Sequence, residues 1–308
     1  MKKSQILAVI MATSIFMSFA LGSGSTSSDS TKAISGTSGD NNVTDDKDAA
    51  DATTTAPKTL MPTIDEQVVV DEDGIKITAK EYTSDSIFGD GIKFLIENET
   101  EYNLTIGIKA LIVNDFMISD TFVTEVAAGK KTNETMTLSS SQLKAAGIDV
   151  IGQIEVYFHI YDSDTWDDIL NPDCVTIKTS LYDQMDTTAD DSGEVLFDEG
   201  GVRIIGKAVN DSDFWGAGVL FYVENNSGRD ITVRADNVSI NGFTFDSVYF
   251  STTVYDGKKV YDDMTLFSSE LEENDIKNIE EVSLTFEIYD PDSYSTITES
   301  DEITFYAK

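Results

Sequence analysis

The chain has 308 residues, of which 56 are Asp or Glu and 21 are Lys or Arg, so its formal net charge is -35. Hydrophobic residues make up 40% and aromatic residues 10%, enough apolar surface for folded cores, which argues against a wholly disordered acidic chain. Because so negative a surface repels phosphate backbones and anionic lipid, we expect no nucleic-acid partner and no electrostatic docking on membranes.

The first 22 residues have the organisation of a secretory signal peptide. Lys2 and Lys3 precede an almost uninterrupted apolar run over residues 6–21, and small residues follow. We therefore expect an extracytoplasmic protein, secreted or associated with the cell surface. An uncleaved signal anchor is the alternative and the only expected link to a membrane, although the run is shorter than the roughly 20 residues of a spanning helix.

Two segments have the composition of linkers. Residues 23–65 are rich in Ser, Thr and Asp and carry hardly an aliphatic side chain before Leu60, so they predict a disordered, solvated tether. A shorter acidic segment, residues 183–193, separates two longer patterned segments. We place repeat 1 at residues 66–182 and repeat 2 at residues 194–308.

The two patterned segments are copies of one another. Residues 91–98, Gly-Ile-Lys-Phe-Leu-Ile-Glu-Asn, align with residues 218–225, Gly-Val-Leu-Phe-Tyr-Val-Glu-Asn. After a single inserted residue, Ile160–Asp164 aligns with Ile288–Asp292, and the register holds to the end of the chain. Coherence over this length indicates a duplicated domain.

Each copy has the periodicity of β-strands. Ile154, Val156, Phe158 and Ile160 alternate with polar or tyrosine residues, as expected for strands with one buried face, and residues 282–289 repeat the pattern. Tight hairpin turns are predicted at four dipeptides: Asp73-Gly74, Asn114-Asp115, Gly200-Gly201 and Asn241-Gly242. We expect an all-β fold of two antiparallel sandwiches, each with seven or eight strands.

One short helix is expected in each copy. The segments are residues 140–146 and residues 269–273, and both carry serines at their start that are suited to capping. Ser269 and Glu272 have the spacing of a capping box, in which each side chain bonds the other residue's backbone N–H.

The signal, the tether and the tandem motifs together resemble a known group of proteins. The motifs are Asp-Glu-x-Gly-[Ile/Val], Phe-x-[Ile/Val]-Glu-Asn, Gly-Lys-Lys and Phe-x-Ile-Tyr-Asp-x-Asp. They resemble the immunoglobulin-like β-sandwich domains of poorly characterised exported proteins and lipoproteins of Gram-positive bacteria. The resemblance covers residues 66–308 and implies two tandem immunoglobulin-like domains in the cell envelope, without an active site. Ser23 stands where the lipoproteins have their lipidated cysteine, which leaves the mode of surface retention open.

Paired carboxylates recur in one loop of each copy. Asp162 and Asp164, and likewise Asp290 and Asp292, are two residues apart and could ligate one Ca²⁺ from a loop. The alternative is that Asp162 and Asp290 cap their own turns, because Asp at a strand end accepts hydrogen bonds from the following backbone. No other cofactor is predicted.

Aromatic residues also recur at predicted loop tips. Trp166 matches Tyr294 within the acidic loops, and Phe88 matches Trp215 before paired glycines. Such side chains could stack on a sugar or anchor a protein partner, or they could close the ends of the sandwich.

Residue types that often act in catalysis are expected to have structural roles in this chain. His159, the only histidine, has no orienting partner or nucleophile nearby in the sequence, so we expect an exposed strand position. Cys174, the only cysteine, fits a small buried hydrophobe. Tyr161 and Tyr289 end predicted strands, where sandwich tyrosines bond to nearby backbone.

The sequence therefore predicts an exported, non-enzymatic cell-envelope protein that acts as an interaction or structural module. Its partner would be a protein or glycan at the cell surface. The alternative is a Ca²⁺-stabilised carbohydrate- or protein-binding module that uses the acidic loops.

Overall fold

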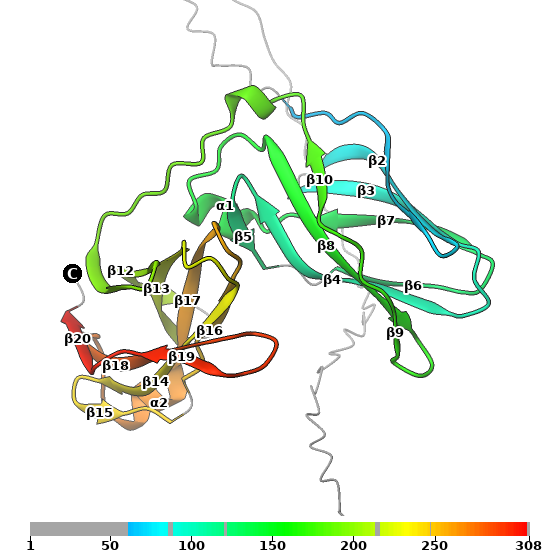
Figure 1. Cartoon of the computed structure of the whole chain (residues 1–308). Coiled ribbons are helices and arrows are strands. Elements are labelled where there is room, and N and C mark those ends of the chain that lie inside the picture. Colours follow the sequence, from blue (N-terminus) through cyan, green and yellow to red (C-terminus); the bar gives the residue numbers. More distant parts are fainter. Residues whose placement is uncertain (1–60, 86–88, 120–121, 213–215, 247, 307–308) are drawn as a thin grey trace, which may run out of the picture. The chain divides into compact units, whose positions relative to one another are not determined.

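The computed structural model describes residues 61–85, 89–119, 122–212, 216–246 and 248–306 (Figure 1). The predicted signal peptide and residues 23–60 of the predicted tether lie outside the described residues. Thr63, at the end of the predicted tether, exchanges two hydrogen bonds with Ser180. Among the described residues, no helix has the length and apolar character needed to cross a membrane.

Repeat 1 is built from antiparallel strands in two groups. One sheet has the order β1-β2-β3-β7, and the other group has the order β10-β8-β4-β5, with β6 also pairing β4 and β9 also pairing β8. A helix, α1 (Ser140–Ala145), follows β7, and a short 3-10 turn, η1 (Tyr182–Gln184), follows β10. The strands are β1 (Gln67–Glu72), β2 (Ile75–Asp85), β3 (Gly89–Asn98), β4 (Leu104–Val113), β5 (Phe116–Ile118), β6 (Val123–Val126), β7 (Lys131–Thr137), β8 (Gln153–Asp162), β9 (Asp168–Leu170) and β10 (Val175–Lys178).

Repeat 2 has the same order of elements. The group β11-β12-β13-β17 corresponds to β1-β2-β3-β7, and the second sheet has the order β15-β14-β18-β19, with β16 on β14 and β20 on β18. A parallel pairing of Lys259 with Phe116 joins β17 to β5. The elements are β11 (Glu194–Glu199), β12 (Val202–Ser212), β13 (Gly216–Asn225), β14 (Ile231–Ile240), β15 (Phe243–Thr244), β16 (Ser251–Val254), β17 (Lys259–Phe267), α2 (Ser268–Glu273), β18 (Glu281–Tyr289), β19 (Thr296–Glu299) and β20 (Ile303–Tyr306).

Ten strands are described in each repeat, so the expected count of seven or eight was too low. The missed strands are short: β5 and β9 have three residues each and β15 has two. A strand of two or three residues is too short to show the alternation of polar and apolar residues on which the prediction depends. The all-β class is confirmed, as is antiparallel pairing of the described strands within each repeat.

Most buried hydrophobic residues of each repeat form one cluster between its sheets, and Ile205, Tyr222 and Tyr261 of repeat 2 join the cluster of repeat 1. Ile154, Val156, Phe158 and Ile160 of β8 are buried as predicted from their alternation. Phe94 of β3 meets Phe158 edge-on, with ring centroids 5.6 Å apart, and their equivalents Phe221 and Phe286 do the same at 5.6 Å. Opposing sheets are therefore packed face to face in the manner of a β-sandwich.

The predicted hairpin turns are present. Asp73 and Gly74 both have positive φ, at 50° and 79°, as the two-residue turn between β1 and β2 requires. Gly201 in the equivalent turn has no room for a side chain, because a Cβ would lie 2.6 Å from the backbone oxygen of Asn226. Turn residues also hold distant segments: the side chains of Asn114 and Asn241 each make three hydrogen bonds to the segment that precedes or begins β8 and β18.

The asparagine of the Glu-Asn motif is the buried hub of each repeat. Asn98, 1% exposed, donates from Nδ2 to the backbone oxygens of Tyr102 (2.8 Å) and Val126 (2.9 Å). Its Oδ1 accepts from the backbone N–H and the hydroxyl of Thr100. Asn225 makes the four equivalent bonds in repeat 2. The motif is thus explained by the fold, since one side chain connects a strand end, a turn and a neighbouring strand.

The helices lie where they were predicted, but the predicted capping is wrong. The N-cap residues are Ser139 and Phe267, and neither makes a side-chain capping bond. Ser269 lies inside α2, so it does not form the expected capping box with Glu272. The reason is that β17 runs directly into α2 at Phe267, which moves the start of the helix one residue earlier than the serine pattern indicates.

Candidate functional site

The two acidic loops are the tips of equivalent hairpins, β8–β9 and β18–β19, which extend past the strands beside them (Figure 1). Asp162 ends β8, and its Oδ1 accepts hydrogen bonds from the backbone N–H groups of Asp164 (2.7 Å) and Thr165 (3.1 Å). Asp290 does the same for the second and third residues after it. The N–H of Ser293 donates to Asp290 and holds the pKa of that carboxyl below its ordinary value. These bonds are those of the predicted turn-forming aspartates.

The structure brings each pair of predicted metal ligands into one turn but shows no larger ligand set. Among the described residues, no group of three or more His, Cys, Asp or Glu side chains is placed to hold a metal ion. Asp162 Oδ1 is already engaged by backbone, and Asp164 Oδ2 accepts from Asn103 Nδ2 at 3.3 Å. Ca²⁺ binding by Asp162, Asp164, Asp290 and Asp292 stays a prediction.

An aromatic side chain stands exposed at each tip, stacked on a tyrosine from the preceding strand. Trp166 is 73% exposed, and its ring lies 5.5 Å from that of Tyr161 with 18° between the planes. Tyr294 is 77% exposed and lies 6.3 Å from Tyr289 at 26°. Both outer residues have positive φ, 66° and 56°, a conformation that costs a non-glycine residue about 1 kcal/mol. Rings so exposed do not cover the core.

Sequence reasoning missed the stacking role of Tyr161 and Tyr289. A backbone partner was expected for these hydroxyls, whereas the Tyr289 hydroxyl lies 3.4 Å from the side-chain oxygen of Ser251. The signal was an aromatic pair five residues apart in both copies, Tyr161 with Trp166 and Tyr289 with Tyr294. Phe88 and Trp215, the other predicted contact residues, lie outside the described residues.

His159 has a partner that the sequence did not indicate. Its Nε2 lies 2.6 Å from Asp168 Oδ1, and this hydrogen bond lowers the pKa of the Asp168 carboxyl. The equivalent residue in repeat 2, Glu287, accepts from the Thr296 hydroxyl at 2.6 Å and pairs with Arg234 at 2.6 Å. In both repeats this position connects the two strands of the tip hairpin, so its role is to hold the tip in place.

Cys174 is half-buried, immediately before β10. Burial raises the pKa of its thiol above the ordinary value. Since the thiolate is the reactive form, this environment disfavours nucleophilic chemistry, although the side chain is less buried than we expected from the sequence.

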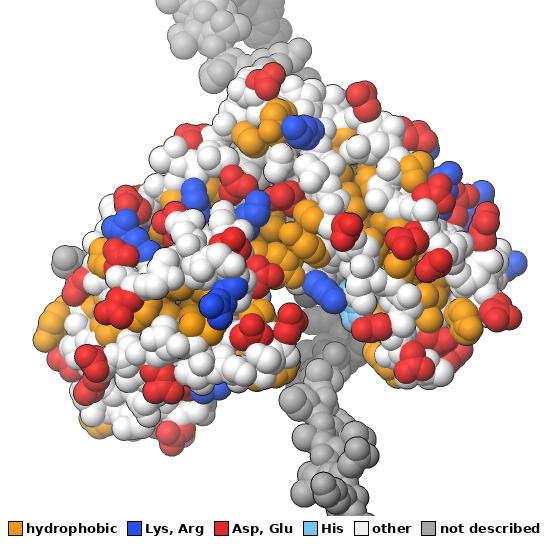
Figure 2. Space-filling view, in the orientation of Figure 1, with side chains coloured by type: hydrophobic (Ala, Val, Ile, Leu, Met, Phe, Trp, Pro, Cys, Tyr) orange, Lys and Arg blue, Asp and Glu red, His pale blue; other side chains and the backbone are white. Residues whose placement is uncertain are grey.

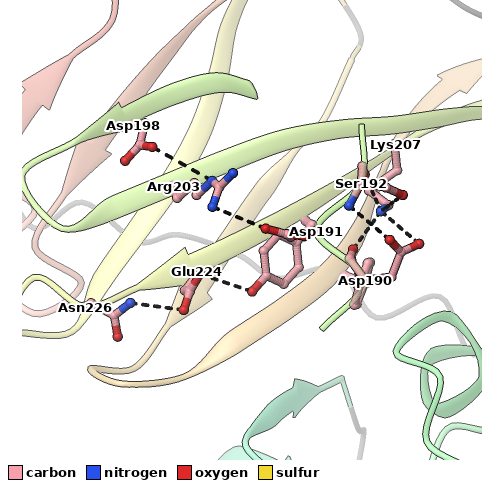
Figure 3. Close-up of polar contacts among 10 residues, drawn as sticks. Asp190, Asp191, Ser192, Asp198, Arg203, Lys207, Glu224 and Asn226 are labelled. Atoms are coloured by element: carbon pink, nitrogen blue, oxygen red, sulfur yellow. Dashed lines mark hydrogen bonds and ion pairs between the residues drawn. The ribbon is translucent and has the colours of Figure 1, made fainter. Parts of the chain in front are cut away.

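The acidic segment between the repeats is fastened to repeat 2 by a lysine (Figure 3). The Lys207 side chain is only 10% exposed, and its Nζ donates to the backbone oxygens of Asp190, at 2.7 Å, and Ser192. Asp190 Oδ2 lies 3.1 Å from the same nitrogen, and Arg203 pairs with Asp191 at 3.3 Å. Hydrogen bonds from Ser192, joined by Lys207, lower the pKa of Asp190 to about 2.

Ser192 Oγ lies 3.2 Å from Lys207 Nζ, the spacing of a serine–lysine catalytic pair. Lys207 Nζ is already engaged by the backbone oxygens of Asp190 and Ser192 and by Asp190 Oδ2, so its contacts serve to hold the acidic segment. We therefore assign these contacts a structural role, and we call the contacts of Lys207 with Asp190 and Ser192, which hold the acidic segment on repeat 2, the clip.

The surface around these features is acidic. Figure 2 shows Asp and Glu side chains spread over the visible face, with hydrophobic side chains appearing between them. This distribution agrees with the net charge of -35 and disfavours polyanionic ligands.

No family model and no curated protein matches the chain. Among solved structures, it is similar over 73% of its length to an exo-chitosanase of Amycolatopsis orientalis, at 11% identity and a TM-score of 0.23. It is also similar over 79% of its length to a transglutaminase of red sea bream, at 11% identity and a TM-score of 0.18. The chain spans 26% and 31% of those proteins, and likeness at this level carries no argument about activity.

Proposed function

We propose that this chain is an exported, non-enzymatic cell-envelope protein whose two tandem immunoglobulin-like β-sandwich domains act as interaction modules on a flexible tether. The signal-peptide pattern and the Ser/Thr/Asp-rich segment support export and display. The duplicated element order, and the burial of equivalent residues in each repeat such as Phe94 with Phe158 and Phe221 with Phe286, support two domains of one kind.

One observation supports an interaction role above the others. The polar residues that recur in the motifs make hydrogen bonds within the fold, as Asn98 and Asn225 do, so they are not available to a partner. The exposed aromatic tip also recurs in both repeats, yet it covers no core. A large side chain held out to solvent on a rigid hairpin is suited to contact a partner.

Cell fractionation tests the proposal. The full chain should be processed near residue 22 and recovered outside the cytoplasm, whereas a variant with Ile10→Asp in the apolar run should stay inside. Retention of the unaltered chain in the cytoplasm would contradict export. A hydrolase activity abolished by a single substitution would contradict the non-enzymatic assignment.

The second candidate is a Ca²⁺-stabilised carbohydrate- or protein-binding module, supported by the recurrence of the Asp-x-Asp turn beside each aromatic tip. Thermal unfolding with EDTA, with Ca²⁺ and with Mg²⁺ at matched ionic strength tests it. A specific site gives a saturable rise with Ca²⁺ that Mg²⁺ does not reproduce. The double variant Asp164→Ala, Asp292→Ala should remove that rise while keeping the turns of Asp162 and Asp290. Equal small shifts from both ions would mean charge screening alone.

A further inference from the structure

Two stacked rings stand at each hairpin tip, and the outer ring is exposed. Trp166 is flanked by the exposed residues Thr165 and Asp167, and its inner face lies against Tyr161. Tyr294 is likewise flanked by exposed serines and lies against Tyr289. Each tip therefore presents one open aromatic face within polar surroundings.

The size of this surface separates two kinds of partner. An aromatic side chain contributes about 150–250 Å² when it is fully buried. Trp166 with the half-buried Tyr161 thus offers well under the roughly 800 Å² that each side of a stable protein–protein interface buries. The area of one or two aromatic faces corresponds instead to one or two sugar rings.

The polar groups around each exposed ring indicate which class of sugar would bind. The C–H face of a pyranose packs on an aromatic face, whose quadrupole is negative. The sugar hydroxyls can donate to acceptors beside the ring, such as the exposed carboxylates of Asp164 and Asp167 in repeat 1 and Asp292 in repeat 2. The net charge of -35 opposes sulfated, phosphorylated or uronic-acid polymers.

We infer that Tyr161 with Trp166, and Tyr289 with Tyr294, form two glycan platforms, each stacking on a pyranose ring of an uncharged polysaccharide. This inference rests on the proposed interaction function and names its ligand class. Two platforms on one chain suit a polymer of repeating units, because a second contact on the same polymer raises avidity by about 100-fold or more.

Binding of short neutral oligosaccharides to the purified full chain tests the inference. The probes are cellotetraose, mannotetraose and the N-acetylglucosamine tetramer, with a hyaluronan tetrasaccharide as the anionic comparison and an oligoarginine peptide as the cationic one. The variants are Trp166→Asn, Tyr294→Asn and the double variant, since asparagine tolerates positive φ without supplying an aromatic face. Tyr249→Asn is the matched control, because Tyr249 is 72% exposed but lies outside both tips.

We expect at least one neutral tetrasaccharide to bind at two sites per chain, at one site in either single variant and at none in the double variant. Tyr249→Asn should bind as the unaltered chain does. The Trp166 indole N–H resonance should shift on titration of the unaltered protein, which tests the first platform even where a variant folds poorly. Affinity for the matching long polymer should fall about 100-fold in either single variant.

Three results would overturn the inference. The first is no response to any neutral tetrasaccharide at millimolar concentration, and the second is equal glycan binding by the double variant and the unaltered chain. The third is that the tip variants lose binding to the oligoarginine peptide alone. The last would identify a cationic peptide as the partner. A chain recovered outside the cytoplasm that binds no neutral glycan would retain the proposed function and lose this inference. A chain that binds neutral glycans but remains in the cytoplasm would support this inference and contradict the proposed export.

Discussion

Replacing Asn98 with alanine tests whether the Glu-Asn motif serves the fold. The substitution removes four hydrogen bonds, and the one to Val126 O is buried. Leaving that carbonyl without a partner costs about 1–3 kcal/mol, and the three partners nearer solvent lose about 0.5 kcal/mol each when water replaces the amide. We therefore expect Asn98→Ala to lower the free energy of unfolding by about 3 kcal/mol.

Urea unfolding followed by far-UV circular dichroism measures this loss as a lower midpoint at an unchanged slope. Asn225→Ala should cost a similar amount, because its side chain makes the equivalent four bonds. Asn226→Ala is the matched control: Asn226 is exposed and its side-chain nitrogen donates to Glu224 at 3.1 Å, so its cost should stay below about 0.5 kcal/mol. If Asn98→Ala and Asn226→Ala had equal midpoints, the assignment of the motif to the fold would be wrong.

Three further predictions concern the clip, a buried phenol and the tip turns. Lys207→Met keeps the apolar stem but loses the bonds to Asp190 and Ser192, with a stability loss of about 1–2 kcal/mol. The Ser192 amide, which donates to Asp190 Oδ1, should then exchange hydrogen faster, and unchanged protection would refute the role of Lys207 in holding this segment. Burial, aided by the nearby charge of Asp190, raises the pKa of Tyr261 to about 12, so its contribution to stability is complete below pH 10 and is lost as pH rises through 12. Stability curves over this range should therefore differ from those of Tyr261→Phe, and parallel curves would contradict the assignment. Asp162→Ala should lower the melting temperature of the protein by removing two turn hydrogen bonds, while Asp162→Asn, which keeps the acceptor, should change it little.

Much of the fold could be predicted because it depends on local periodicity and turn chemistry. The buried face of β8 follows from the alternation of Ile154, Val156, Phe158 and Ile160. The turn at Asp73-Gly74 follows from the preference of those residues for positive φ. In both cases the information lies within a few residues, so no knowledge of distant contacts is needed.

The features that escaped prediction depend on contacts between distant residues. The buried bond from Asn98 to Val126 spans 28 positions, and the fastening of Asp190 by Tyr261 spans 71. The pairing of His159 with Asp168 is closer in sequence but depends on β9, a three-residue strand that periodicity does not detect. The candidate site was only partly predicted: its outer rings were identified from their loop positions, while their stacking on the strand tyrosines required the geometry of the turn.

The duplication separates what the fold requires from what it only permits. At one tip position the copies differ chemically, His159 against Glu287, yet both side chains connect the same two strands, so the fold constrains the contact rather than the residue. At the outer position Trp166 and Tyr294 are both aromatic, although each is over 70% exposed and accepts positive φ. Stacking on a tyrosine is worth about 0.5–1.5 kcal/mol, which only offsets the cost of that conformation. Because the net gain for folding is close to zero, stability does not account for an aromatic ring at both tips, and this is the reason we propose contact with a ligand there.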